Sequence, residues 1–199
     1  MYRKYIKRLL DIICAVLALT VFCWLYLIIA ILVRIKLGSP VVHCAIRIGK
    51  EFADSVDDFT KVLTIETSGV AFALTTAMAN GNVPIVFAKK SKSAIVDSLN
   101  CYHASIKSFT RDIVSDVTVN KKYLSNEDKV VIVDDFLAEG NAALGLISIA
   151  RQAGATIVGV CAVVNKTFQG GEKKINDLGI KVVSGAKISS IDGGEIKFE

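Results

Sequence analysis

The sequence predicts an α/β protein in which a parallel sheet is flanked by helices and preceded by one hydrophobic membrane helix. Two observations support this fold class. Residues 12–33 form a run of 22 residues without a charged side chain. After residue 47, short and fully apolar segments alternate with helical stretches, which is typical of parallel strands that are buried on both faces of a sheet. We expect a membrane-associated helix with basic flanks over residues 1–44 and an α/β domain over residues 45–199.

The charge-free run is long enough to cross a membrane. A helix of this length extends about 33 Å, and the hydrocarbon core of a bilayer is about 30 Å thick. The run lacks a small-residue cleavage site, so we expect an anchor that contacts the membrane through residues 9–34, not a removed signal peptide. The alternative is a buried helix of a soluble protein. Basic residues flank both ends, so spanning and re-entrant topologies both stay open.

Charge is distributed unevenly along the chain. Residues 1–50 contain eight basic residues and one acidic residue, whereas residues 51–199 contain sixteen basic and eighteen acidic residues. The basic flanks suit an anionic cytoplasmic membrane face, and the acidic remainder offers no footprint for nucleic acid. Five scattered cysteines without CxxC spacing indicate a reducing compartment and argue against a disulfide framework or a zinc site.

The remaining elements follow one another as strand and helix units. Segments 104–109 and 116–120 alternate polar and apolar residues with period two, which predicts a hairpin or an edge pair. The core strands are predicted at residues 61–65, 84–88, 130–133 and 156–164, and the helices between them at residues 69–79 and 141–152.

Three loops leave the carboxyl ends of these strands, at residues 66–69, 89–93 and 134–142. Open α/β sheets bind their ligands at this edge. The loops contain carboxylates, hydroxyls, glycines and three lysines. This mixture suits a phosphorylated sugar with a metal ion.

The third loop carries the clearest chemistry, in the segment VVIVDDFLAEGNAA. Asp134 and Asp135 can accept hydrogen bonds from vicinal hydroxyls and help to hold Mg²⁺. The small residues that follow leave backbone N–H groups accessible, and a helix beginning near Asn141 directs its positive end to the same place, as in a phosphate cradle. The alternative is an ordinary strand-to-helix turn with solvated aspartates.

With these loops in this order, residues 47–199 resemble the type I phosphoribosyltransferases of the xanthine-specific bacterial kind. The segment VVIVDDFLAEGNAA is similar to the family's signature for 5-phosphoribosyl 1-diphosphate (PRPP). Other counterparts are TIETSG, FAKKSKS, SFT, YLSNEDKV, SIARQAGA and NKTFQGG.

The resemblance implies a role for each matching position. Asp134 and Asp135 would be the catalytic carboxylates that engage the ribose hydroxyls and, indirectly through PRPP, the metal. Lys166 would contact the purine. The PRPP-binding positions would be Glu66, Thr67, Ser68, Gly69, Lys89, Ala138, Glu139, Gly140, Asn141 and Ala142. As alternatives, Glu66 and Ser68 could cap a helix, the lysine cluster could be a charged loop face, and Lys166 a solvated surface residue.

The implied reaction belongs to purine salvage. N9 of xanthine displaces diphosphate from C1 of PRPP and gives xanthosine 5′-monophosphate (XMP), with Mg²⁺ neutralising the leaving group and a mobile loop at residues 92–115 excluding water. Ala138 stands where hypoxanthine-type enzymes have an aspartate, so catalysis without a dedicated general base is expected. The resemblance also implies a homodimer. Together with the N-terminal helix, we expect a cytoplasmic domain that is anchored to the cytoplasmic face of the membrane.

A second resemblance covers residues 1–50, which are similar to the membrane segment of bacterial sugar transferases, the monotopic phosphoglycosyl transferases. MYRKYIKRLLDII, GSPV at residues 38–41 and RIG at residues 47–49 match that order. Cys23-Trp24 replaces the family's Ser-Pro kink, which favours a straight span, and the match is expected to end near Lys50.

The xanthine-type family has its own segment before the RIG triplet, including residues that line the base pocket. In this sequence the sugar-transferase-like membrane segment stands in place of that segment. One alternative is therefore a fusion product that binds PRPP but is catalytically impaired because part of the purine pocket is missing. Another is a non-catalytic PRPP-sensing regulator, although the chain has no helix-turn-helix pattern.

Overall fold

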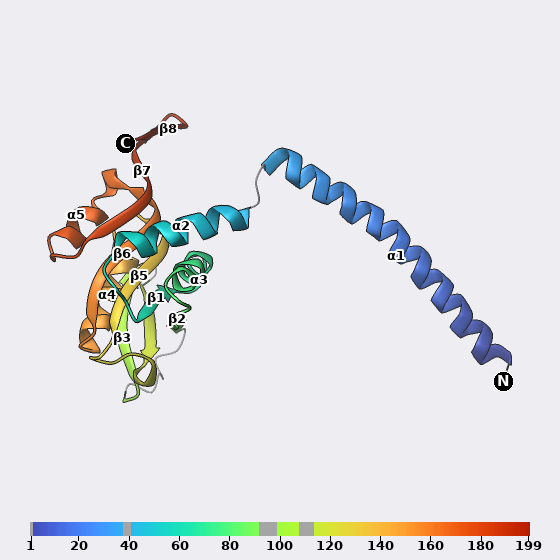
Figure 1. Ribbon diagram of the computed structural model, residues 1–199, viewed down its shortest axis with the longest axis horizontal. Helices are drawn as coiled ribbons and strands as arrows, with labels where there is room; N and C mark the ends of the chain where they lie inside the picture. Colours follow the sequence, from blue (N-terminus) through green and yellow to red (C-terminus); the bar gives the residue numbers. More distant parts are fainter. Residues whose placement is uncertain (1, 38–40, 92–98, 108–113) are drawn as a thin grey trace. The chain divides into compact units, whose positions relative to one another are not determined.

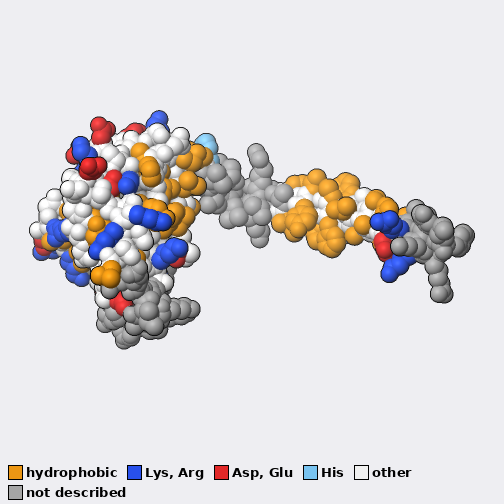
Figure 2. Space-filling view, turned by 90° about the horizontal axis from the view of Figure 1, so that it is seen from below, with side chains coloured by type: hydrophobic (Ala, Val, Ile, Leu, Met, Phe, Trp, Pro, Cys, Tyr) orange, Lys and Arg blue, Asp and Glu red, His pale blue; other side chains and the backbone are white. Residues whose placement is uncertain are grey.

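In the computed structural model, which describes residues 2–37, 41–91, 99–107 and 114–199, the chain divides into two units, Met1–Cys44 and Ala45–Glu199 (Figure 1). The first unit contains a single long helix, α1 (Tyr2–Leu37). Within it, the stretch Asp11–Ile29 is long and apolar enough to cross a membrane, and none of it is buried. Figure 2 shows apolar side chains along this helix. The predicted hydrophobic N-terminal helix is therefore confirmed as a helix.

The second unit is built on one mixed sheet. Over the described residues the strand order is β3-β4-β2-β1-β5-β6-β7-β8. The strands from β2 to β7 in this order are parallel to one another, whereas β4 pairs antiparallel with β2 and β3 at one edge and β8 pairs antiparallel with β7 at the other. The strands are β1 (Lys61–Ile65), β2 (Ile85–Ser91), β3 (Cys101–Lys107), β4 (Val114–Asn120), β5 (Lys129–Leu137), β6 (Thr156–Lys166), β7 (Val182–Asp192) and β8 (Glu195–Phe198).

The predicted parallel sheet is confirmed, with antiparallel strands added at both edges. The period-two segments form the expected hairpin, because β3 and β4 pair from Cys101 and Asn120 to Lys107 and Val114. β5 is longer than predicted. Its ladder to β6 continues past the apolar residues and includes the pair of Phe136 with Val164.

Helices cover both faces of the sheet. They are α2 (Val41–Ser55), α3 (Val70–Ala79), α4 (Asn141–Gln152) and α5 (Gly171–Asn176), with two short 3₁₀ turns, η1 (Lys121–Tyr123) and η2 (Thr167–Gln169). Because both faces are covered, the central strands need apolar side chains on both sides, which explains why the sequence shows continuous apolar runs there.

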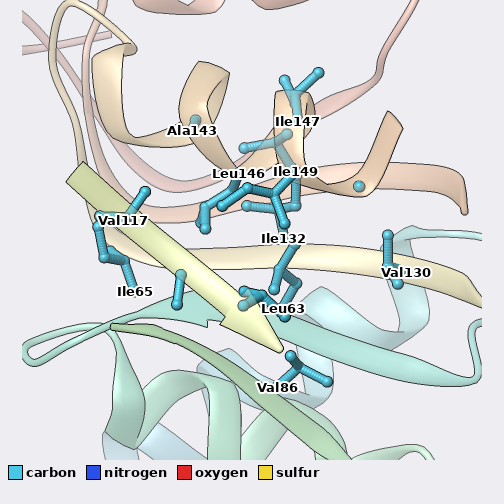
Figure 3. Packing of buried hydrophobic residues seen from close by; sticks show 14 of the residues in the cluster. Leu63, Ile65, Val86, Val117, Val130, Ile132, Ala143, Leu146, Ile147 and Ile149 are labelled. Atoms are coloured by element: carbon cyan, nitrogen blue, oxygen red, sulfur yellow. The ribbon is translucent and has the colours of Figure 1, made fainter. Parts of the chain in front are cut away.

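The two faces have separate cores, and β5 contributes to both. Val130 and Ile132 pack with Leu146 and Ile149 of α4, as Figure 3 shows. Val131 and Val133 belong to the opposite core. That core contains Phe52 of α2 and Ala73 of α3. Successive residues of β5 thus alternate between the cores, as the pleat of a strand requires.

Candidate active site

A cavity of about 400 Å³ lies at the carboxyl ends of the parallel strands. Its lining comes from the loop after β1, the last part of β2, the segment from β5 into α4, and the end of β6. Two residues of the β3–β4 hairpin region, Ile106 and Val117, complete the apolar part of its wall. This is the edge at which the sequence places its three polar loops.

Asp134 is the most buried acidic group of the cavity. Its side chain is almost inaccessible, with 7% of the residue exposed, and its Oδ1 accepts a hydrogen bond from the Asp135 N–H at 2.9 Å. Burial, and after it the adjacent Asp135 carboxyl, together raise the pKa of Asp134 to about 7, and the charge of Lys90 opposes the shift. Asp135, half-buried, also lines the cavity.

The loop after β1 is held close to Asp134. Glu66, Thr67 and Ser68 all line the cavity, and the peptide bond between Glu66 and Thr67 is cis. Gly69 precedes α3 and serves as its N-cap without a side-chain capping bond. Glu66 and Ser68 are therefore not the N-cap of α3, which was the alternative role for them. Gly69 is buried beneath the cavity and is not part of its lining.

The segment after β5 forms a compact turn into α4. Residues 138–142 all line the cavity. Gly140 has φ of +85°, a left-handed conformation that favours glycine, and its carbonyl accepts the first helical hydrogen bond from Leu144 at 2.8 Å. Asn141 Nδ2 donates to Glu139 Oε2 at 3.1 Å. The N-terminus of a 12-residue helix thus borders the cavity, which is favourable for an anion.

The lysine predicted from the sequence is not the one that lines the cavity. Lys90 does so and Lys89 does not, because neighbouring residues of a strand point to opposite faces. Lys89 pairs with Thr118 and Lys90 with Val117 in the antiparallel ladder to β4. Lys92 and Ser93 of the predicted loop lie outside the described residues, as do residues 92–98 and 108–113 of the predicted mobile loop.

Lys166 ends β6 and lines the same cavity. Its Nζ lies 5.3 Å from the centroid of the Phe136 ring, a cation–π distance. Phe136 is half exposed and also lines the cavity, and the sequence motif alone does not predict a role for it. The signal available was its position, since an aromatic residue directly follows the two aspartates at the end of a strand.

The polar groups of the cavity do not by themselves build a metal site. Over the described residues, no cluster of three His, Cys, Asp or Glu side chains could hold an ion. Mg²⁺ is commonly held by one or two carboxylates together with the oxygens of a phosphorylated substrate. Asp134 and Asp135 fit that pattern, because they are adjacent carboxylates beside a turn that is suited to bind a phosphate.

Comparison with known proteins gives two different matches. The model of the family described as Bacterial sugar transferase matches residues 2–91. This is less than half of the chain, and it extends past the expected end near Lys50. Residues 61–91 of that match nevertheless contain strands β1 and β2 of the sheet and the helix α3 between them.

The curated relatives are xanthine phosphoribosyltransferases. The protein from Moorella thermoacetica is 46% identical over 155 residues, which cover 77% of this chain and 78% of the relative. The protein from Bacillus cytotoxicus is 43% identical over 153 residues, covering 76% and 77%.

Similar solved structures are adenine phosphoribosyltransferases. The enzyme from Thermoanaerobacter pseudethanolicus has a TM-score of 0.62 at 20% identity, covering 73% of this chain and 80% of that one. The enzyme from Giardia lamblia has a TM-score of 0.63 at 19% identity, covering 73% and 78%. The structures show that the fold is shared, and identity of 46% over more than three quarters of the sequence shows the family. The chain belongs to the xanthine phosphoribosyltransferase family and is a phosphoribosyltransferase.

Proposed function

We propose that this phosphoribosyltransferase acts in purine salvage and converts xanthine and PRPP to XMP and diphosphate. The observation that carries the proposal is the meeting, in one cavity, of the Asp134–Asp135 pair, the turn at residues 138–142 and Lys166. These groups come from the ends of two neighbouring parallel strands. Together they match a substrate with vicinal hydroxyls, a phosphate and an attached base.

The PRPP half of the site is supported by the donors and acceptors available. Asp134 and Asp135 would accept hydrogen bonds from the two ribose hydroxyls. Residues 138–142 and the first turn of α4 would hold the 5-phosphate through backbone N–H groups. Residues 66–69 would lie beside the diphosphate. Lys90 is better placed than Lys89 to add a positive charge there, because it lines the cavity.

The purine half rests on Lys166 and Phe136. A lysine ammonium only donates hydrogen bonds, so it suits the 6-oxo group of xanthine and cannot accept from the 6-amino group of adenine. The exposed ring of Phe136, next to the ammonium, offers a face against which a purine can stack. The names of the curated relatives favour the same base.

Catalysis in this proposal depends on electrostatics and positioning. Positive charge develops at C1 of the ribose as diphosphate leaves, and the carboxylates of Asp134 and Asp135 face the ring that carries it. Mg²⁺ bound with PRPP would neutralise charge on the leaving diphosphate. Ala138 offers no proton acceptor, so we assign no general base to the turn.

We also propose that α1 tethers this enzyme to the cytoplasmic face of a membrane through residues 9–34, with residues 45–199 as the catalytic domain of a homodimer. The exposed apolar stretch Asp11–Ile29 supports the tether. A second candidate function is PRPP binding without turnover. It is favoured by the coverage of the relatives, because about a fifth of each relative has no counterpart in the matched part of this chain.

The test is nucleotide formation by the full chain with PRPP and, in turn, xanthine, hypoxanthine, guanine and adenine. XMP formation with preference for xanthine is expected, with loss of turnover when Asp134 and Asp135 are both replaced by Asn. Asp57 and Asp58 provide a matched control, because they are also adjacent but exposed. Unchanged turnover in the Asp134/Asp135 variant would show the assignment to be wrong, and PRPP binding without any turnover would favour the second candidate.

A further inference from the structure

The first turn of α5 is bonded directly to the turn that borders the cavity. The Gly171 N–H donates to the Ala138 carbonyl at 3.1 Å. Lys174 Nζ donates to the Glu139 carbonyl at 3.0 Å. Both acceptors belong to the backbone, so these bonds restrain the path of the chain at residues 138–140 and not merely a side chain.

The two segments are in backbone contact at Gly171. A Cβ at this position would lie 2.7 Å from Gly140 N and 2.9 Å from the Glu139 carbonyl carbon. Real Cβ atoms essentially never approach that closely. Gly171 is therefore required by the close packing of α5 on the turn, not by its own backbone conformation.

The same turn of α5 is also bonded to the end of β6. Glu172 Oε2 accepts from Asn165 Nδ2 at 2.7 Å, and Oε1 accepts from Lys187 Nζ at 2.8 Å. Asn165 is fully buried and immediately precedes Lys166. Glu172 and Lys187 are partly exposed, but breaking their charge-assisted link to Asn165 would leave the fully buried Asn165 amide N–H group without its acceptor, so the network favours one arrangement.

We propose that the first turn of α5 is a positioning element that sets the distance between the phosphate-binding turn at residues 138–142 and the purine contact Lys166. Lys174 and Glu172 are its positioning residues, and neither lines the cavity. The proposal rests on the proposed function, because it needs PRPP at one end and the purine at the other. Displacement requires N9 and C1 to be held near attacking distance, where a misplacement of about 1 Å costs about 100-fold in rate.

Adjacent lysines of α5 allow a matched test in the full chain. Lys174→Met removes the bond to the Glu139 carbonyl. Lys173→Met removes the same charge one residue away. Both lysines are exposed, and Lys173 is paired with Asp177, the residue that follows α5, among the contacts described. We expect Lys174→Met to lower kcat/KM for PRPP about tenfold, as for the loss of one hydrogen bond from a charged group. Lys173→Met should stay within about twofold, and Lys174→Arg should recover most of the loss.

Glu172→Gln should act at the other end and raise the KM for xanthine more than the KM for PRPP. The same comparison can be made by calorimetric binding of PRPP, which does not require turnover. Equal effects of Lys174→Met and Lys173→Met, or no recovery by Lys174→Arg, would overturn the positioning proposal alone. Failure of the unsubstituted chain to bind PRPP would instead overturn the proposed function, and the positioning proposal with it.

Discussion

Gly69 and Asp134 lie in direct contact. A Cβ at Gly69 would lie 2.9 Å from Asp134 Oδ1 and 3.0 Å from Thr64 Oγ1. Thr64 Oγ1 is itself buried and has no hydrogen-bond partner within the described structure. The loop after β1 is therefore packed against the carboxylate that β5 brings to the cavity, and Gly69 is the residue that permits this contact.

Gly69→Ala should consequently displace Asp134. We expect the free energy of unfolding to fall by about 1–3 kcal/mol from overpacking and kcat/KM for PRPP to fall by at least about tenfold. Urea unfolding and steady-state kinetics measure the two effects. Gly193→Ala serves as a control, because its site is open and carries only the cost of a positive φ. Full activity in Gly69→Ala would contradict a positional role for this contact.

Burial of Asp134 should make stability depend on pH. Its pKa is about 7 in the folded chain against 3.8 as the ordinary value, so the folded state binds this proton more tightly than the unfolded state. The group therefore destabilises the fold as pH rises above about 4, and the full cost, on the order of 4 kcal/mol, is present above pH 7.

Asp134→Asn should remove this cost, since the amide keeps an oxygen that can accept the Asp135 N–H. The variant should gain stability over the unsubstituted chain progressively from pH 4 to pH 7 and then show a constant gain. Unfolding by urea at a series of pH values gives the curve. Asp57→Asn, at an exposed position, should leave it unchanged. A gain that does not vary with pH would contradict the assignment to Asp134.

Lys89 and Lys90 should differ in their effect on PRPP. Lys90→Met removes the cation that lines the cavity beside Asp134 and should raise the KM for PRPP about tenfold. Lys89→Met removes a charge from the opposite face of the same strand and should have an effect within about twofold. Kinetics of the two variants at one salt concentration decide between them. A larger effect from Lys89→Met would instead support Lys89 as the PRPP-binding lysine, as the sequence resemblance implies.

Lys166 should determine the choice of purine. Lys166→Met should raise the KM for xanthine about tenfold through loss of a charge-assisted hydrogen bond, and should leave the KM for PRPP nearly unchanged. Lys197→Met, on the exposed strand β8, is a control of equal charge. Competition between xanthine and adenine shows whether the preference for an oxo group depends on Lys166, and an unaltered preference would exclude it as the determinant.

α1 should hold the chain on membranes. The full chain should remain in the pellet after carbonate extraction of membranes, whereas a double substitution of Leu19 and Leu25 by Lys in the exposed apolar stretch should weaken retention. An equivalent double substitution at Leu178 and Tyr123, also exposed but in the second unit, should not. Release of the unsubstituted chain into the soluble fraction would rule out insertion.

Much of the local structure could be predicted from the sequence because its causes are local. β1 and α4 have the predicted bounds, since an apolar run ends at a polar loop in one case and a glycine precedes the helix in the other. The length of β5 could not be predicted, because its last residues are strand only through pairing with β6.

The same distinction applies to the candidate site. The residue types at the strand ends are visible in the sequence, and the fold brings most of them to one cavity. The choice between Lys89 and Lys90 depends on which face of β2 is turned toward the cavity, and that is fixed by long-range pairing with β4. Phe136 was missed for a similar reason, since its exposure depends on where the neighbouring strands end.

The position of β5 has a consequence for motion. It lies between β1 and β6, and its residues Val130 to Val133 are buried in the two cores on either side. Its amide protons should therefore exchange with solvent only when the whole domain unfolds. The aspartates at its end would then stand on a slowly exchanging strand, and opening and closing around a substrate would be accomplished by the segments that surround them.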